Sequence, residues 1–182
     1  MSGGHVEAHG EHNKGIALLI AILALVLALS ETLGKGAQTA ALDANIEASN
    51  LWAFFQAKTI RQTTLRTVAE LLEALGTGEA AKGQAEAWKK TAARYQSEPE
   101  TGEGRAELSA RAKKAEQRRD RSMAAYHHYE LASAAVQIAI VLASASIITA
   151  IPALAWLAGA LGAVGAALCV VGFWFPAAVH LY

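Results

Sequence analysis

The stretch that decides the fold is residues 131–182, LASAAVQIAIVLASASIITAIPALAWLAGALGAVGAALCVVGFWFPAAVHLY. No Lys, Arg, Asp or Glu occurs after Glu130. A run of about 20 apolar residues is enough to cross the hydrocarbon core of a bilayer as a helix, and this run is more than twice that long. Pro152 divides it near the middle. The pattern predicts two membrane-spanning helices, over residues 131–151 and 153–175, with 176–182 as a C-terminal tail.

A further apolar run, residues 16–29, lies near the N-terminus. As a helix it would be about 21 Å long, which is short for a hydrocarbon core of about 30 Å. We therefore expect a span over residues 15–33, which places Glu31 in its last turn. A cleaved signal peptide is the competing interpretation, because Lys14 precedes the run and Ala28-Leu29-Ser30 resembles a cleavage site. The sequence favours a retained span.

The charged residues lie almost entirely between these spans. Of the 16 Lys and Arg residues, 15 lie between Lys35 and Arg121, and 13 of the 16 acidic residues lie between Asp43 and Glu130. This near balance argues against nucleic-acid binding, which requires a clear basic excess. Residues 34–130 are therefore expected to form a soluble region.

Residues 34–130 show the periodicity of helices, which we expect at about 37–76, 79–96 and 105–130. In the first, small and apolar residues recur at intervals of three and four, which is typical of an amphipathic helix that needs partner helices. These residues are Leu42, Ile46, Ser49, Ala53, Ala57, Ile60, Thr64, Val68, Leu71 and Leu75. The predicted fold class is all-α, an integral membrane protein with three transmembrane helices and a long, coiled-coil-like helical cytoplasmic region.

Three segments of the sequence resemble a known family. Residues 47–62, EASNLWAFFQAKTIRQ, are similar to a signature of the DUF4337 family of bacterial membrane proteins of unknown function. Residues 134–159, with Gln137 inside an apolar helix, and the His- and Glu-rich N-terminal tail are also similar. The resemblance implies one N-terminal span, a soluble helical middle and a pair of C-terminal spans. It implies no activity and no catalytic residues.

Polar side chains inside the expected spans are candidates for a pore or for contacts between helices. They are Glu31, Gln137, Ser144, Ser146 and Thr149. Glu31 can reach the head groups as a solvated carboxylate, or it can face a bundle interior and handle protons or cations. Hydroxyl and amide groups in lipid favour hydrogen bonds with neighbouring helices. The sequence leaves these alternatives open.

Small and aromatic residues in the C-terminal half suggest how the spans pack and where they end. Small residues, which let helix backbones approach closely, are Ala139, Ala143, Gly159, Gly162 and Gly165. Aromatic residues expected as anchors at the membrane–water interface are Tyr126, Tyr129, Trp156 and Trp174. Cys169 is the single cysteine, so no disulfide can form within the chain.

The N-terminal tail, residues 1–14, carries His5, His9 and His12. On a helix these side chains would share one face, and clustered imidazoles can bind zinc. Gly3, Gly4 and Gly10 weaken any helix here, which favours a solvated polar tail instead. No cofactor is expected.

No motif for nucleotide binding, for hydrolysis by a nucleophilic serine or for metalloprotease chemistry is present. We therefore expect a non-enzymatic structural or interaction protein that forms a homo-oligomer in the lipid bilayer, through small-residue transmembrane faces and long cytoplasmic helices. An unidentified membrane protein is a further possible partner. The alternative is an oligomeric ion channel or proton-conducting pore that uses Glu31 and Gln137.

Basic residues predict the orientation in a bacterial inner membrane. Arg118, Arg119 and Arg121 lie close to the second span, and positively charged flanks stay in the cytoplasm. We expect the N-terminus outside, with residues 34–130 and the C-terminus in the cytoplasm.

Overall fold

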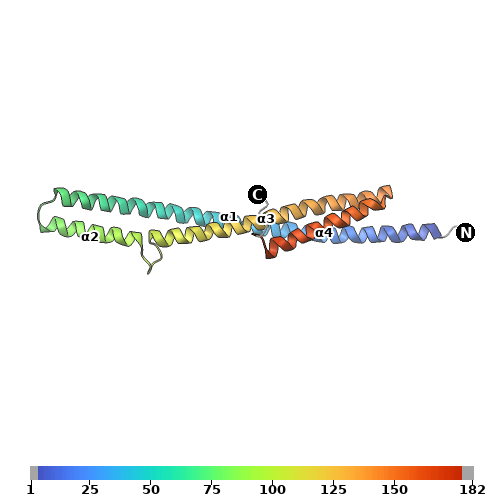
Figure 1. The fold of residues 1–182 in the computed structure, drawn as a ribbon, viewed down its shortest axis with the longest axis horizontal. Helices are drawn as coiled ribbons and strands as arrows, with labels where there is room; N and C mark the ends of the chain where they lie inside the picture. Colours follow the sequence, from blue (N-terminus) through green and yellow to red (C-terminus); the bar gives the residue numbers. More distant parts are fainter. Residues whose placement is uncertain (1–3, 178–182) are drawn as a thin grey trace. The chain divides into compact units, whose positions relative to one another are not determined.

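Four helices account for nearly all of the chain, as the helical periodicity and the scarcity of proline predict. The computed structural model describes the backbone of residues 4–177 and the side chains of residues 14–177, and no strand occurs within them. The helices are α1 (Gly4–Leu75), α2 (Glu79–Gln96), α3 (Arg105–Thr149) and α4 (Pro152–Trp174) (Figure 1). The all-α class is therefore confirmed.

Helix α1 is longer than the sequence predicts. It begins at Gly4, inside the expected polar tail, and it passes without a break through residues 34–36, between the span expected at 15–33 and the helix expected at about 37–76. Glycine costs only about 1 kcal/mol in a helix interior, and no proline lies in this segment. Gly34 also serves packing, because a Cβ placed there would lie 3.4 Å from the Cβ of Tyr129.

The chain divides into two compact units. Unit 1 comprises residues 1–41 and 120–182, and unit 2 comprises residues 42–119. Three helices, namely α1 from Lys14 onward, α3 and α4, are long and apolar enough to cross a membrane. This finding supports the expected number of spans by length and composition.

In unit 1, α1, α3 and α4 pack around a small apolar core. Its buried members are Ile16, Leu23, Val136, Ala139, Ala143 and Ala158. Helix α4 approaches closely because it presents glycines: Gly162 faces Leu23 of α1, and Gly165 faces Val136 and the Ala132 carbonyl of α3. Gly159 has no neighbour within 4 Å of an added Cβ. Most of the small-residue surface expected to join separate copies is therefore used within one chain.

A tight hairpin joins α3 to α4. Ala150 adopts a left-handed conformation, with φ 55°, and Pro152 opens α4. Proline disfavours helical geometry in the residue before it and fits the first turn of a helix. The Ser146 hydroxyl donates a 3.0 Å hydrogen bond to the Ile151 carbonyl and so closes the turn. These features explain why the apolar stretch breaks at Pro152.

In unit 2, α1 packs against α2 and against the first part of α3 (Figure 1). Nine buried or half-buried positions of α1 recur in alternating steps of four and three, which gives a seven-residue repeat. They are Ala44, Ala48, Leu51, Phe55, Lys58, Gln62, Leu65, Ala69 and Leu72. They meet Ala85 and Ala92 of α2 and Leu108, Ala112 and Ala115 of α3, all of which are buried. The core of unit 2 is therefore thin and rich in alanine.

The stripe that the sequence singled out on residues 37–76 is not the one that packs inside the chain. Its large members remain exposed, among them Ile60 at 67% and Leu75 at 74%. Together with Leu42, Ile46, Val68 and Leu71, and with the small residues between them, they form what we call the outer stripe. The inner positions pack inside the chain instead of the outer stripe. Their partners on α2 and α3 are alanines, which allow close contact, and Lys58 and Gln62 have polar partners there.

Lys58 is the centre of a polar cluster inside unit 2. Its ammonium nitrogen lies 3.9 Å from Glu98 and 3.7 Å from Glu103, and its side chain is only 8% exposed. The same nitrogen lies 5.4 Å from the ring centroid of Phe54 and 5.1 Å from that of Tyr95. Cations are attracted to aromatic faces at such distances. The cluster therefore ties α1 to the loop between α2 and α3.

Two carboxylates hold that loop in place. The Arg94 guanidinium donates a 2.6 Å hydrogen bond to Glu98, and this bond lowers the pKa of the Glu98 carboxyl. The Ser97 hydroxyl donates a 2.6 Å hydrogen bond to Glu107, and this bond lowers the pKa of Glu107. Hydrogen bonds to a carboxylate favour its charged form. The acidic loop is therefore fixed by internal partners.

Candidate functional site: a polar pocket between α1 and α3

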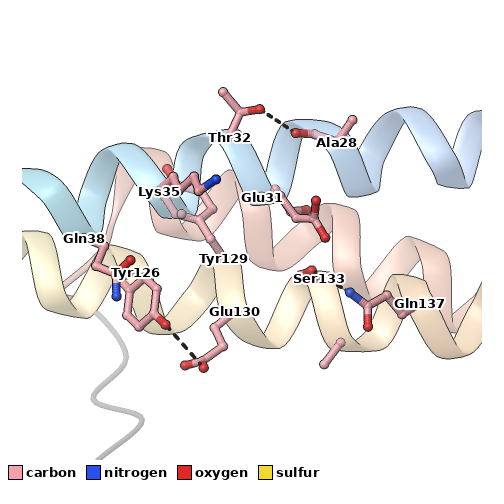
Figure 2. A pocket seen from close by; sticks show the side chains of 13 residues that line it. Ala28, Glu31, Thr32, Lys35, Gln38, Tyr126, Tyr129, Glu130, Ser133 and Gln137 are labelled. Carbon is pink, nitrogen blue, oxygen red and sulfur yellow. Dashed lines mark hydrogen bonds between the residues drawn. The ribbon is translucent and has the colours of Figure 1, made fainter.

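Unit 1 contains an open pocket of about 720 Å³ between α1 and α3. Residues of α1 on one side and of α3 on the other line it, and Figure 2 shows their side chains. The lining residues are Ala28, Ser30, Glu31, Thr32, Gly34, Lys35, Gln38, Tyr126, Tyr129, Glu130, Ser133, Ala134 and Gln137. Pockets that bind drug-sized molecules have about 300–1,000 Å³. The volume is therefore sufficient for a small organic group.

The pocket brings together Glu31 and Gln137, two of the five polar residues that the sequence marked within the expected spans. The Glu31 side chain points toward α3, on the same side as Ser133 and Gln137 (Figure 2). The Gln137 amide donates a 3.4 Å hydrogen bond to the Ser133 hydroxyl. Glu31 makes no hydrogen bond or ion pair within residues 14–177. Its carboxylate is therefore available to a ligand.

Two further charges lie at the pocket. Glu130 accepts a 3.4 Å hydrogen bond from the Tyr126 hydroxyl and lies 3.7 Å from His127 Nδ1. Lys35, one helical turn after Glu31, is exposed and makes no ion pair among the described side chains. The pocket thus carries two carboxylates and one ammonium group, together with two tyrosine rings and two glutamine amides.

Residues that sequence reasoning missed hold the helices of unit 1 together next to the pocket. The Ser30 hydroxyl donates a 2.9 Å hydrogen bond to the Val26 carbonyl and lies 3.1 Å from the sulfur of Cys169 on α4. Gly172 of α4 gives room to His128 and Tyr129. A serine in an apolar run and a glycine near a helix end were the available signals for this packing.

The side chain of Tyr129 is therefore not exposed as an anchor at the membrane–water interface would be. It is only 5% exposed, because its side chain packs between Gly34 and Gly172. Its neighbour His128 is also buried, with Nδ1 2.7 Å from the Ala124 carbonyl oxygen and no partner for Nε2 among the described atoms. Tyr126, which is half-buried, keeps its hydroxyl at the pocket.

The protein-family model described as "Domain of unknown function (DUF4337)" matches residues 12–175, which is nearly the whole chain. The chain belongs to the DUF4337 family. No curated protein and no solved structure matches it. Membership in DUF4337 confirms the resemblance seen in the sequence, and it carries no assigned activity.

The remaining polar residues predicted for a pore lie away from the pocket of this DUF4337 chain. The hydroxyls of Ser144 and Thr149 donate hydrogen bonds of 2.8 Å to the carbonyls of Ile140 and Ala145, on their own helix. Ser146 bonds to the hairpin carbonyl of Ile151. Each hydroxyl is therefore satisfied locally and is not directed toward Glu31.

The other predicted site residues of the DUF4337 chain are spread over unit 1. Trp156 is 82% exposed at a second hollow, which it lines with Ile16, Pro152 and Gly159, and Trp174 is exposed near the end of α4. The side chains of His5, His9 and His12 lie outside the described residues. Within residues 14–177, no group of three metal-binding side chains occurs.

Proposed function

We propose that the chain is a non-enzymatic integral membrane protein that associates with copies of itself. Insertion of α1, α3 and α4 as three spans is supported by their length and hydropathy. Their outward surfaces carry large apolar side chains such as Leu25, Val141 and Val164, which lipid would cover. We further propose a bacterial inner membrane, with the N-terminus outside and residues 34–130 and the C-terminus in the cytoplasm. Resistance to alkaline carbonate extraction would test the insertion.

The observation that carries the self-association is the outer stripe of unit 2. Over 34 residues of α1 its ten positions contain no charged residue, although seven charged residues lie elsewhere in the same segment. Isolated apolar residues are normal on a surface, whereas a continuous exposed row marks an interaction site. In a region with an alanine-rich core, this row is a continuous apolar surface left exposed for a partner.

The dimensions of the outer stripe fit a second copy. A stripe of this length is about 50 Å long, and with a width of about 10 Å it offers about 500 Å² per chain. Two copies that join the same stripe would bury about 1,000 Å² in total, which is the lower limit for a specific interface. The proposed occupant of the outer stripe is therefore a second copy; a different membrane protein is the competing outcome of the test.

Introducing charge into the outer stripe should separate the copies. We expect the triple variant Ile46→Glu, Ile60→Glu and Leu71→Glu to run as a monomer in mild detergent, whereas the wild type runs as an oligomer. The reason is that each carboxylate would have to be buried without a partner. Mass measured by light scattering after size exclusion, with cross-linking in native membranes, would report the change.

A matched control keeps this test specific. Asn50→Glu, Thr63→Glu and Thr67→Glu add the same charge at exposed positions of α1 outside the outer stripe, so this variant should remain oligomeric. A wild-type chain that is monomeric in membranes and in mild detergent would overturn the proposal. An assembly that contains only one copy together with another protein would also overturn it.

A second candidate function is an oligomeric proton- or cation-conducting pore. The observation that favours it is the meeting of Glu31 with Gln137 at one open pocket, because carboxylates in membrane spans often mark ion paths. Liposomes containing the wild type should then show proton or cation flux, and Glu31→Gln should reduce it about tenfold or more while leaving the oligomer intact. Absence of flux from the wild type would eliminate this candidate.

A further inference from the structure

The α1–α3 pocket combines charges of both signs with an apolar exit. Glu31 and Glu130 bring a carboxylate from each helix, and Lys35 brings an ammonium group. One turn farther into the apolar part, the face of α3 that carries Ser133 and Gln137 continues with Val141, which is 67% exposed. A ligand that matches this surface needs a cation, an anion and an apolar body.

The position of the pocket along the chain restricts the class of ligand that can reach it. The pocket begins where the uncharged run of α3 begins, after Glu130, and where the apolar run of α1 ends, at Glu31. If the helices cross a bilayer, as proposed above, these residues lie at the level of the lipid head groups. The molecules present there in great excess are phospholipids, which have a polar head group and apolar acyl chains.

We propose that this pocket binds the head group of an ethanolamine phospholipid. The primary ammonium group would donate hydrogen bonds to Glu31 and Glu130 and lie near the ring of Tyr126, and the phosphate would accept from Lys35. Hydrogen bonds between charged groups are about twice as strong as those between neutral groups. An acyl chain would leave the pocket along Val141. The inference rests on the proposed membrane insertion and not on the proposed self-association.

The charges of the pocket predict which head groups it rejects. A choline head group carries a quaternary ammonium without N–H donors, so it cannot donate hydrogen bonds to the two carboxylates. A glycerol head group carries no cation. Its phosphate would be repelled by the carboxylates of Glu31 and Glu130, and only the ammonium group of Lys35 would offset this repulsion. The expected order of affinity is therefore ethanolamine, then choline, then glycerol phospholipid.

Native mass spectrometry of the full-length chain in mild detergent would measure this order. Ethanolamine, choline and glycerol phospholipids with identical acyl chains would be added separately, and the fraction of chains carrying one lipid would be counted. We expect the ethanolamine lipid to bind about tenfold more tightly than the glycerol lipid. Glu31→Gln with Glu130→Gln should remove this preference, and Glu31→Lys with Glu130→Lys should reverse it.

The control is Asp43→Asn with Glu70→Gln, which removes two exposed acids from unit 2 and should leave the preference unchanged. Equal binding of the three lipids, or the same preference after the Glu31 and Glu130 substitutions, would overturn the inference. Displacement of the lipid by equimolar phosphoethanolamine, which lacks acyl chains, would identify a free metabolite as the ligand and would also overturn it.

The outcomes distinguish this inference from the proposed function. A chain that remains in carbonate-washed membranes but shows no head-group preference would overturn the lipid site alone. A monomeric chain that retains the preference would overturn the self-association alone. Release of the chain by carbonate would overturn membrane insertion and the lipid site together.

Discussion

Leu108→Ala should destabilise unit 2 by about 3 kcal/mol or more, which is within the range of buried Leu→Ala substitutions. Leu108 is completely buried, and its cluster consists otherwise of Leu51 and three alanines, with Trp52 and Phe55 at the margin. Alanine side chains cannot extend into the space that the substitution would leave. The cost should therefore include an unfilled cavity as well as lost apolar burial.

Denaturant unfolding followed by tryptophan fluorescence would measure this change in the full-length chain in detergent. Trp52 and Trp88 lie in unit 2, so a background with Trp156→Phe and Trp174→Phe restricts the signal to that unit. Gln84→Ala is the control, because Gln84 is exposed on α2, outside the outer stripe, and its truncation should change the free energy of unfolding by less than about 0.5 kcal/mol. Equal effects of the two substitutions would show that the assigned core is wrong.

Gly165→Leu should detach α4 from α3 in unit 1. A Cβ at Gly165 would lie 3.1 Å from the Ala132 carbonyl oxygen and closer still to Val136. A backbone carbonyl inside a helix cannot move aside as a flexible side chain can. Overpacking of this kind costs about 1–3 kcal/mol, which for a chain of this size lowers the unfolding midpoint by roughly 3–10 °C.

Cys169 offers a direct measurement of this detachment. It is the single cysteine, it is partly buried on α4, and its sulfur lies 3.1 Å from the Ser30 hydroxyl oxygen of α1. The temperature at which a thiol reagent labels Cys169 should fall in Gly165→Leu. Gly159→Leu makes the same change on the same helix where no atom lies within 4 Å, so its labelling temperature should match the wild type. A similar fall in both variants would contradict the packing described for α4.

The sequence predicted the helices well because their limits are set locally. The break at Pro152 follows from the geometry of proline, and the uncharged run after Glu130 is visible without any tertiary information. The continuity of α1 was not predicted, because a glycine such as Gly34 is equally consistent with an interruption of the helix and with close approach of a neighbouring helix. Only the proximity of Tyr129 decides between the two.

The burial of α1 in unit 2 shows a different limit of sequence reasoning. Leu42 and Ile46 were the natural choice for a core face, yet the chain buries Lys58 and Gln62 instead. Burial of these two depends on Glu98 and on Arg105, which lie about 40 residues farther along the sequence. A polar residue in a helical seam cannot be recognised as buried until its partners are known.

For the pocket, composition identified Glu31 and Gln137 but not their arrangement. Glu31 and Gln137 were conspicuous because each is polar within an apolar run. That they face one pocket depends on the register between α1 and α3, which is set by contacts such as that of Gly34 with Tyr129. Lys35 and Glu130 were unremarkable in the sequence, because their charges lie at the ends of apolar runs, where charges are expected.

The two rows on α1 have different repeats, and this has a consequence for any assembly. The inner positions recur every seven residues, whereas the outer stripe recurs in steps of four, three and four, which is a period of eleven. In an ideal helix the inner positions shift by about 20° per repeat around the helix axis in one direction, and the outer stripe shifts by about 20° per repeat in the other. A neighbouring chain that packs along the outer stripe would therefore coil around α1 with the opposite hand to α2 and α3. A fibre or bundle built from this helix would then have a superhelical hand opposite to that within each of its subunits.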